Sequence, residues 1–77
     1  MNKTIETQIG NNIRKLRERA KITQDELAAR LQVRGCDITR SAVAKIEVGQ
    51  RHLYPDEIIL IKQILAVSYD AIFDIDT

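Results

Sequence analysis

The chain has 77 residues, of which 44% are hydrophobic and 30% charged, and its formal net charge is +1. This composition predicts one small globular domain over residues 1–77 and excludes a disordered segment, and no apolar run approaches the roughly 18 residues that span a bilayer. The N-terminal MNKTIETQIG alternates polar and apolar residues, which excludes a signal-peptide core, so we expect a cytoplasmic protein.

Residues 4–20 are predicted to form the first helix. Gly10 inside this stretch lowers helix stability by about 1 kcal/mol relative to Ala. Either a neighbour therefore packs closely there or the first turn is loose. Apolar residues recur every three or four positions, which is the stripe of an amphipathic helix: Ile5, Ile9, Ile13, Leu16 and Ala20.

A second helix is predicted to begin at the capping box TQDE, in which Thr23 accepts from the backbone of Glu26 while Glu26 reaches back. The joint that follows, LQVRGCDITRS, holds a Gly, a Cys and two charges more than a tight turn between two helices needs. A longer joint costs little closure entropy, so we expect this helix to continue through Val33 and to end at Gly35.

The remainder of the long joint is expected to serve both packing and binding. Cys36 or Ile38 would turn back toward the core as an anchor. Arg34 would lie on a protruding corner, where it reaches a phosphate outside the usual footprint or a minor groove. The alternative is a passive surface insertion.

A short third helix is predicted to start after the N-cap Thr39, to bury Val43 and Ile46, and to stop at a left-handed Gly49. Arginine or lysine on a helix in the major groove can read guanine, so this helix is predicted to read DNA. The alternative is that its outward residues form only a solvated helix face. The outward positions combine small residues with long donors: Arg40, Ser41, Ala42 and Lys45.

Two further helices complete an all-α chain. Pro55 fits the first turn of a fourth helix, and the apolar run over residues 58–65 predicts that this helix is the most buried one. Ser68 predicts the cap of a last short turn that ends at Phe73.

The distribution of charge favours a polyanionic partner. Residues 1–53 carry eleven Lys and Arg against six Asp and Glu, whereas residues 54–77 carry one Lys against five acidic residues. Such a division fits one surface that meets a polyanion. The lone Cys36 excludes an intrachain disulfide, and His52 has no paired carboxylate, so it is expected near a backbone phosphate or exposed. We therefore expect no metal, no cofactor and no enzyme activity.

Three segments in order, IGNNIRKLRERAKITQDELAARL, ITRSAVAKIEVGQR and ILAVSYDAIF, resemble the lambda-repressor/Cro-like helix-turn-helix family, also called XRE-type or Cro/C1-type. The resemblance covers nearly the whole chain and implies a compact five-helix DNA-binding domain. The family usually runs from a Leu-Gly end of the second helix straight into a Val-Ser start of the third. Here Ile38 and Thr39 occupy that start and about five extra residues precede it, in the inserted stretch from Gln32 to Ile38.

The resemblance also implies site residues. Gln24 resembles a glutamine that contacts a phosphate and buttresses the third helix; otherwise it is only a solvent-facing member of the capping box. Arg51 matches a loop that grips the DNA backbone. Arg17 and Glu47 match a pair that bridges the first and third helices and presents the arginine toward phosphate, with a surface salt bridge of about 0–1 kcal/mol as the alternative. Thr39 is counted among the DNA-binding residues. The base-facing positions are Arg40, Ser41, Lys45 and Ala42, the last of which can pack against a thymine methyl.

We therefore expect a sequence-specific transcriptional regulator, a small repressor that occupies a palindromic operator as a homodimer. With no effector domain it would act by occupying double-stranded DNA, and two copies would raise affinity and selectivity together. The rival is a protein-interaction module on the same fold, antitoxin-like or an anti-repressor partner. The chain ends soon after Phe73, so we expect self-association through the end of the fourth helix together with Tyr69, Ile72 and Phe73. The alternative is that these three residues only close the core of their own chain.

Overall fold

Five helices follow one another in the computed structural model, which describes residues 3–76. The predicted domain 1–77 is therefore described apart from residues 1, 2 and 77. No strand occurs within the described range, and the all-α prediction is confirmed. The helices are α1 (Lys3–Arg19), α2 (Gln24–Val33), α3 (Arg40–Glu47), α4 (Pro55–Leu65) and α5 (Tyr69–Ile72).

The predicted helix starts are confirmed by their caps. The Thr23 hydroxyl accepts from the Glu26 N–H at 3.1 Å, and the Glu26 carboxylate accepts from the Thr23 N–H at 3.1 Å. The Thr39 hydroxyl accepts from the backbone N–H of Ala42 at 3.1 Å. Ser68 caps α5 in the same way. Each hydroxyl satisfies a backbone donor that the first turn of a helix leaves free.

The first three helices end in the same backbone motif, with a residue of positive φ at Lys21 (60°), Gly35 (84°) and Gly49 (77°). The N–H of the residue after each one donates back to the carbonyl of the last helical turn, at 2.8–3.1 Å. This is the Schellman arrangement, which satisfies free carbonyls and stops the helix. The end of the second helix at Gly35 and of the third at Gly49 are thus confirmed.

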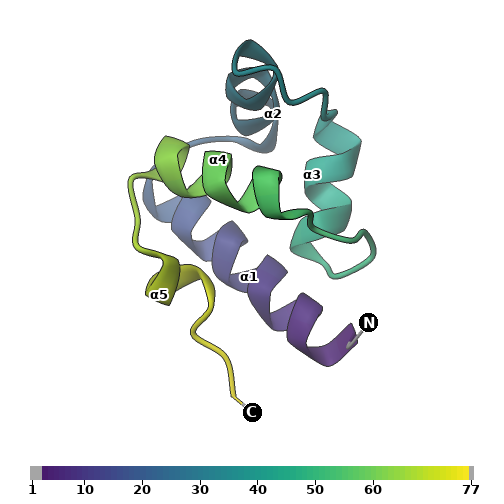
Figure 1. The fold of residues 1–77 in the computed structure, drawn as a ribbon, viewed down its shortest axis with the longest axis vertical. Helices are drawn as coiled ribbons and strands as arrows, with labels where there is room; N and C mark the ends of the chain where they lie inside the picture. The colour runs from purple at the N-terminus through teal and green to yellow at the C-terminus, as the bar shows by residue number, and fades with distance from the viewer. Residues whose placement is uncertain (1–2, 77) are drawn as a thin grey trace.

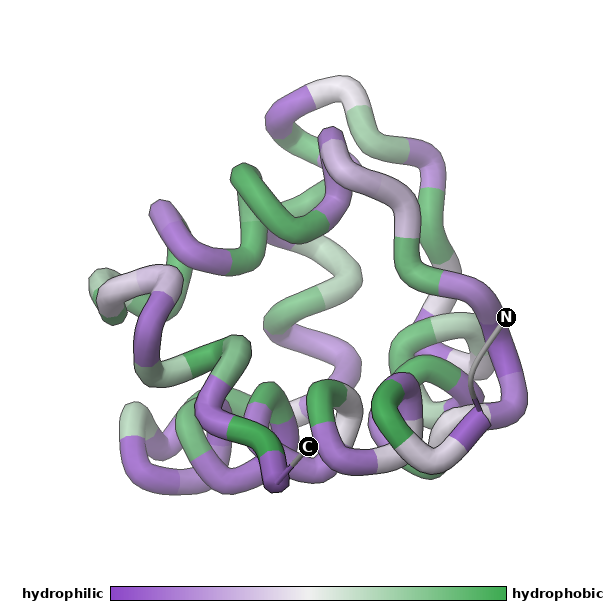
Figure 2. Tube along the Cα trace, turned by 60° about the horizontal axis from the view of Figure 1, so that its bottom comes forward, coloured by the Kyte–Doolittle hydropathy of each residue, from purple (hydrophilic) through white to green (hydrophobic). Residues whose placement is uncertain are grey.

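The core lies where α1 and α2 pack against α3, with α4 against α2 and α5 against α1 (Figure 1). Hydrophobic and hydrophilic residues follow one another along the chain in Figure 2, and every helix contributes buried residues to the core. Side chains that are fully or almost fully buried come from all of these helices and from the joint: Ile13, Leu27, Leu31, Ile38, Val43, Ile61 and Ile72.

The prediction that α4 is the most buried helix is wrong. Three of the eleven residues of α4 are buried, Glu57, Ile61 and Leu65, against three of the eight residues of α3, and Ile59 is 45% exposed. The apolar run extends around more of the helix than its contacts can cover, because α4 crosses in front of α1 in Figure 1 and leaves its outer side open.

Gly10 marks the closest approach of two helices. A Cβ built on Gly10 would collide with the carbonyl oxygen of Ile46 and come within 3.1 Å of the Glu47 Cα. The open question at Gly10 is thus resolved in favour of a close neighbour, since the end of α3 rests on the backbone of α1 at this point. The glycine allows a helix contact that a side chain would prevent.

The long joint between α2 and α3 packs as predicted. Ile38 is buried in the core, and Cys36 is partly buried against it. The Gln32 side-chain amide donates to the Ile38 carbonyl at 2.7 Å, which ties the end of α2 to the start of α3. Burial raises the pKa of the Cys36 thiol. The joint therefore lengthens α2 while α3 keeps its own contacts with the core.

The C-terminal part of the chain closes the core against α1. The Asn12 side-chain amide donates to the carbonyls of Ile72 at 3.0 Å and of Asp74 at 2.9 Å. Ile72 is 0% exposed, so its prediction as a self-association residue is wrong, because its side chain is used by the core of its own chain. Tyr69 and Phe73 remain exposed.

Candidate nucleic-acid interface

The outer face of α3, defined here as Arg40, Ser41 and Lys45, is exposed to solvent, whereas Val43 and Ile46 point into the core. This separation follows from the helical period, which places positions 41 and 45 opposite positions 43 and 46. Two long cationic donors thus flank a small hydroxyl. Ala42, also predicted to face bases, is half-buried against the core and keeps only part of its surface accessible.

A buried network holds α3 from behind. Arg17 donates to Glu47 through Nε (2.7 Å) and Nη2 (3.0 Å), and through Nη1 to the Ile22 carbonyl at 2.8 Å. Arg17 is 8% exposed and Glu47 3%, so the alternative of a surface salt bridge is wrong. The hydrogen bonds to Glu47 raise the pKa of the Arg17 guanidinium. The predicted bridge between the first and third helices is therefore present, and it is an internal one.

Gln24 joins this network from the first position of α2. Its side-chain amide donates to Glu47 Oε1 at 3.0 Å. The Gln24 side chain is therefore engaged with α3, and the alternative of a merely solvent-facing residue is wrong. An amide nitrogen carries two donors, so one N–H of Gln24 remains for another acceptor.

Asp25 is a neighbour of the outer face that the sequence did not single out. Arg40 Nε lies 3.9 Å from Asp25 Oδ1, and both side chains are largely exposed. Together with Gln24 they border an open depression where the end of α1 meets the starts of α2 and α3. The signal for Asp25 in the sequence was its place beside Gln24 in the capping box.

Arg51 is fixed by α4. Its two Nη nitrogens donate to the carboxylate of Glu57 at 2.8 and 3.0 Å, and Nη1 also donates to the His52 carbonyl at 2.9 Å. Burial raises the pKa of the Glu57 carboxyl, but the hydrogen bonds from Arg51 and from the Tyr54 N–H outweigh it, so the pKa lies below its usual value. The loop between α3 and α4 is thereby tied to the first turn of α4.

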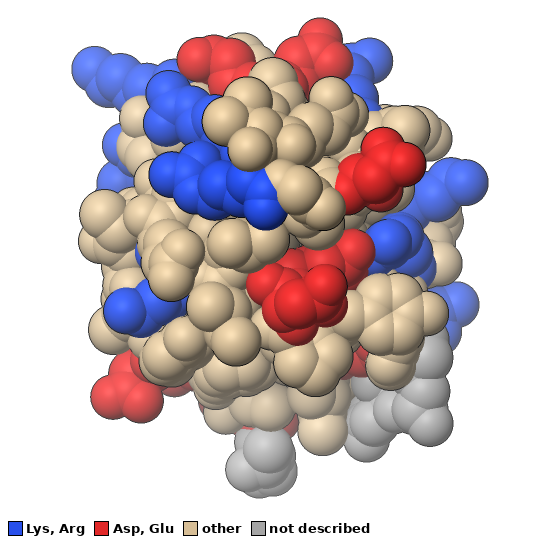
Figure 3. All heavy atoms as spheres, turned by 45° about the horizontal axis from the view of Figure 1, so that its top comes forward, with Lys and Arg blue, Asp and Glu red and all other residues tan. Residues whose placement is uncertain are grey.

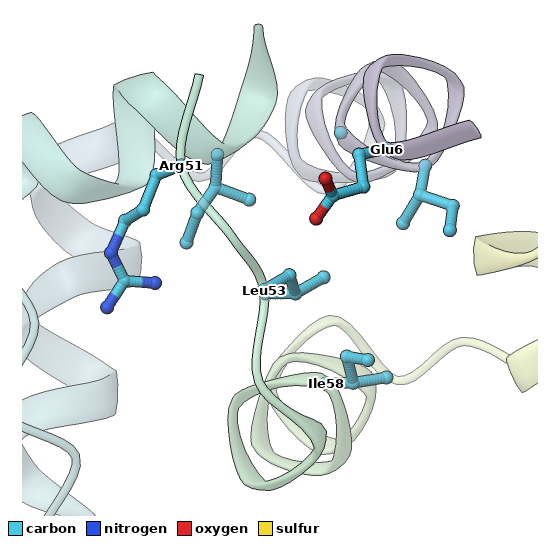
Figure 4. Close-up of a pocket in the computed structure, with 7 residues that line it drawn as sticks. Glu6, Arg51, Leu53 and Ile58 are labelled. Atoms are coloured by element: carbon cyan, nitrogen blue, oxygen red, sulfur yellow. The ribbon is translucent and has the colours of Figure 1, made fainter. Parts of the chain in front are cut away.

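His52 ties the same loop to α1, and its prediction as a lone residue without a carboxylate partner is wrong. His52 Nδ1 lies 2.9 Å from Glu6 Oε1. Glu6 turns its carboxylate into a cavity of about 80 Å³ that is lined mainly by apolar side chains such as Leu53 and Ile58 (Figure 4). This contact joins residues far apart in sequence, so no local pattern could indicate it.

The long joint forms an exposed corner at the top of the molecule in Figure 1. Val33 is 86% exposed, and Arg34 is exposed and donates to the Arg30 carbonyl at 3.2 Å. A Cβ built on Gly35 would meet nothing within 4 Å. The predicted protruding corner is present.

Charge on this end of the molecule is mixed. Figure 3, in which the top of Figure 1 comes forward, shows Lys and Arg from the left edge to the upper centre and along the right edge, with acidic side chains interspersed at the top and in the middle. Within residues 3–76, no group of His, Cys, Asp and Glu is arranged to hold a metal ion. Nor does any helix in that range have the length and apolarity to cross a membrane.

A comparison with protein-family models decides the family. The helix-turn-helix model matches residues 13–72, from the middle of α1 to the end of α5. The chain belongs to the lambda-repressor/Cro-like (XRE-type) helix-turn-helix family. This is a family of DNA-binding regulatory domains and not of enzymes, and the matched residues include all of α2 and α3. Comparisons with curated proteins and with solved structures gave no match.

Proposed function

We propose that this helix-turn-helix protein is a sequence-specific repressor of transcription in the cytoplasm, and that the outer face of α3 reads base edges in the major groove. The observation that carries the proposal is the contrast between that exposed face and the buried Arg17–Glu47–Gln24 network behind it. A helix held by buried charge-assisted hydrogen bonds keeps its side chains in register with the bases. Arg40 and Lys45 supply donors for guanine, and Ser41 suits either a donor or an acceptor.

Backbone contacts would surround the reading helix. Gln24 has a second amide N–H, and the N-terminus of α2 favours a phosphate. Arg51 uses Nη1 and Nη2 on Glu57 and the His52 carbonyl, which leaves Nε–H and one Nη2–H of its five donors for a phosphate. Thr39 lies at the start of α3, and Arg34 lies on the joint between α2 and α3. Each would add one more contact with a phosphate.

The repressor would bind as a homodimer on a palindromic operator. Ile72 is buried and therefore not available to a partner. The self-association surface would instead use exposed apolar residues on α4 and near α5: Ile59, Tyr69 and Phe73. The Lys62 ammonium lies 5.0 Å from the centre of the Tyr69 ring, which orients that ring on the surface. Two modules joined there would each read one half-site.

A footprint of the purified protein on DNA upstream of its own coding region tests the proposal. Two protected half-sites about one helical turn (10–10.5 base pairs) apart are expected, with two chains per duplex in sedimentation. Equal protection of unrelated DNA would contradict sequence-specific binding. One chain on a single half-site would leave the reading helix in place but overturn the homodimer.

A salt titration on a nonspecific duplex separates this function from the protein-interaction module. Binding through phosphates weakens steeply as salt rises, because counterions are released. A module that has lost DNA binding would show no measurable affinity for the duplex at any salt concentration.

A further inference from the structure

Val48 is an exposed apolar residue on the DNA-facing side of α3. It follows the last helical residue, Glu47, and is 51% exposed. Position 48 comes seven residues after Ser41 and three after Lys45. At 3.6 residues per turn, these spacings place Val48 on the same side of the helix as both.

The backbone on both sides fixes where Val48 points. The Gln50 N–H donates to the Lys45 carbonyl at 2.8 Å, and the Gly49 N–H donates to the Ile46 carbonyl at 3.1 Å. Gly49 also lies against α1, since a Cβ built on it would come within 2.9 Å of the Thr7 Cα. The motif that ends α3 thus holds Val48 and Lys45 as one rigid unit.

The surroundings of Val48 fit a nucleic acid better than a protein. The core of a protein interface is a contiguous apolar patch depleted of charge, whereas the outer face of α3 presents Val48 among Arg40, Ser41 and Lys45. The major groove offers the matching pattern, because the C5-methyl group of thymine stands as an isolated apolar group among polar base edges. A small branched side chain that follows the cationic Lys45 on the same side of the helix is complementary to such a groove.

We propose that Val48 is a specificity-determining residue that packs against the C5-methyl group of one thymine in each half-site. Three residues of helix rise about 4.5 Å, close to one base-pair step of about 3.4 Å, so this thymine lies next to the base pair that Lys45 contacts. This inference rests on the proposed function, since it requires α3 to lie in the major groove.

The test removes the C5-methyl group of thymine on the DNA side and both γ-methyl groups of Val48 on the protein side. A preferred duplex is first selected from a random-sequence pool with the wild-type protein. Each thymine of one half-site is then replaced in turn by deoxyuridine, which lacks only the C5-methyl group, and the Kd is measured for wild type, Val48→Ala and Val33→Ala. Val33 on the joint is the matched control, because it is an equally small and even more exposed valine, 86% against 51%.

At one position we expect deoxyuridine to weaken wild-type binding about fourfold, the equivalent of burying one methyl-sized group. Val48→Ala should bind the thymine and deoxyuridine duplexes equally at that position, whereas Val33→Ala should keep the wild-type difference. Circular dichroism and thermal unfolding would confirm that both variants fold.

The inference is overturned if Val48→Ala keeps the same thymine-to-deoxyuridine ratio as wild type at every position, even where its affinity falls. That result would indicate a contact with deoxyribose or none at all, and it would leave the proposed function intact. If selection with wild type yields no preferred duplex, the proposed function fails and this inference fails with it.

Discussion

Arg17 and Arg40 lie close together in the fold, and both border the depression at the start of α2, yet they are built for different tasks. Arg17 is 8% exposed and donates three hydrogen bonds within the protein. Arg40 is largely exposed, and its nearest ion-pair partner, Asp25, lies 3.9 Å away. The comparison teaches that basic residues in this domain divide into internal ties and free donors. Removing a tie should change stability, and removing a free donor should change binding.

The largest expected effect breaks the internal tie. Glu47→Gln should lower the free energy of unfolding by about 3 kcal/mol, because it leaves the Arg17 guanidinium buried without its counter-charge. Urea unfolding of both proteins measures the change. Glu18→Gln is the matched control, since its pair with Arg14 is 3.8 Å long and exposed, and we expect less than about 1 kcal/mol there. Equal effects of the two substitutions would show that burial does not distinguish the pairs.

A free donor should show the opposite behaviour. Arg40→Ala is expected to relax preference at one base pair by about 1 to 3 kcal/mol with no change in the melting temperature, because one bidentate contact to guanine is lost. Binding to duplexes with each base pair varied in turn measures this preference. Gln24→Ala should weaken binding to all sequences similarly. Unchanged preference in Arg40→Ala would mean that α3 lies in a different register.

The second tie, between Arg51 and Glu57, should make stability depend on acid. The pKa of Glu57 is lower in the folded protein than in the unfolded chain, so its contribution is present above the unfolded value of about 4.3 and is lost as pH falls through the folded value. Glu57→Gln should therefore lower the free energy of unfolding by about 1.5 kcal/mol at neutral pH, because hydrogen bonds to a charged carboxylate are weakened, and it should flatten the decline in stability as pH falls below about 4.3. Thermal unfolding across this range measures both effects. Asp56→Asn, an exposed neighbour, should keep the wild-type decline; an equally steep decline in Glu57→Gln would contradict the assignment.

The smallest effect concerns the exposed corner. Arg34→Ala should lower affinity for all sequences slightly and reduce the slope of log K against log salt by about one unit, as expected for one lost phosphate contact. Lys15→Ala removes the same charge on the side of α1 that faces Ala71 and Asp74, and it should leave the slope unchanged. Identical slopes for Arg34→Ala and wild type would make the joint a structural elongation only.

Features that depend on neighbours in sequence could be predicted, because their chemistry is local. The caps at Thr23, Thr39 and Ser68 and the stop at Gly49 each follow from a side chain and a backbone donor or from a preferred φ. The extension of α2 through Val33 was expected because a longer joint costs little closure entropy, and Gly35 supplies the positive φ that ends the helix.

Features that depend on packing between distant segments could not be predicted in the same way. The partner of His52 is Glu6, and the place of Ile72 inside the core depends on how α5 docks on α1. Four apolar residues in succession made α4 look central, whereas only part of that run finds a neighbour. The partner of Arg51 likewise depends on which carboxylate the fold brings to it. The Arg17–Glu47 pair was predicted, but from the family resemblance, because periodicity carries no information on such long-range pairs.

One measurement tests the central claim most directly: the ratio of affinities for the selected duplex and for random duplex, in wild type and in the double variant Arg40→Ala/Lys45→Ala. The wild-type ratio should be at least about 10³, a typical specificity for a DNA-binding regulator, and the double variant should lose most of it while its melting temperature stays unchanged. A wild-type ratio near one, or a double variant that keeps the full ratio, would contradict the claim that the outer face of α3 reads DNA.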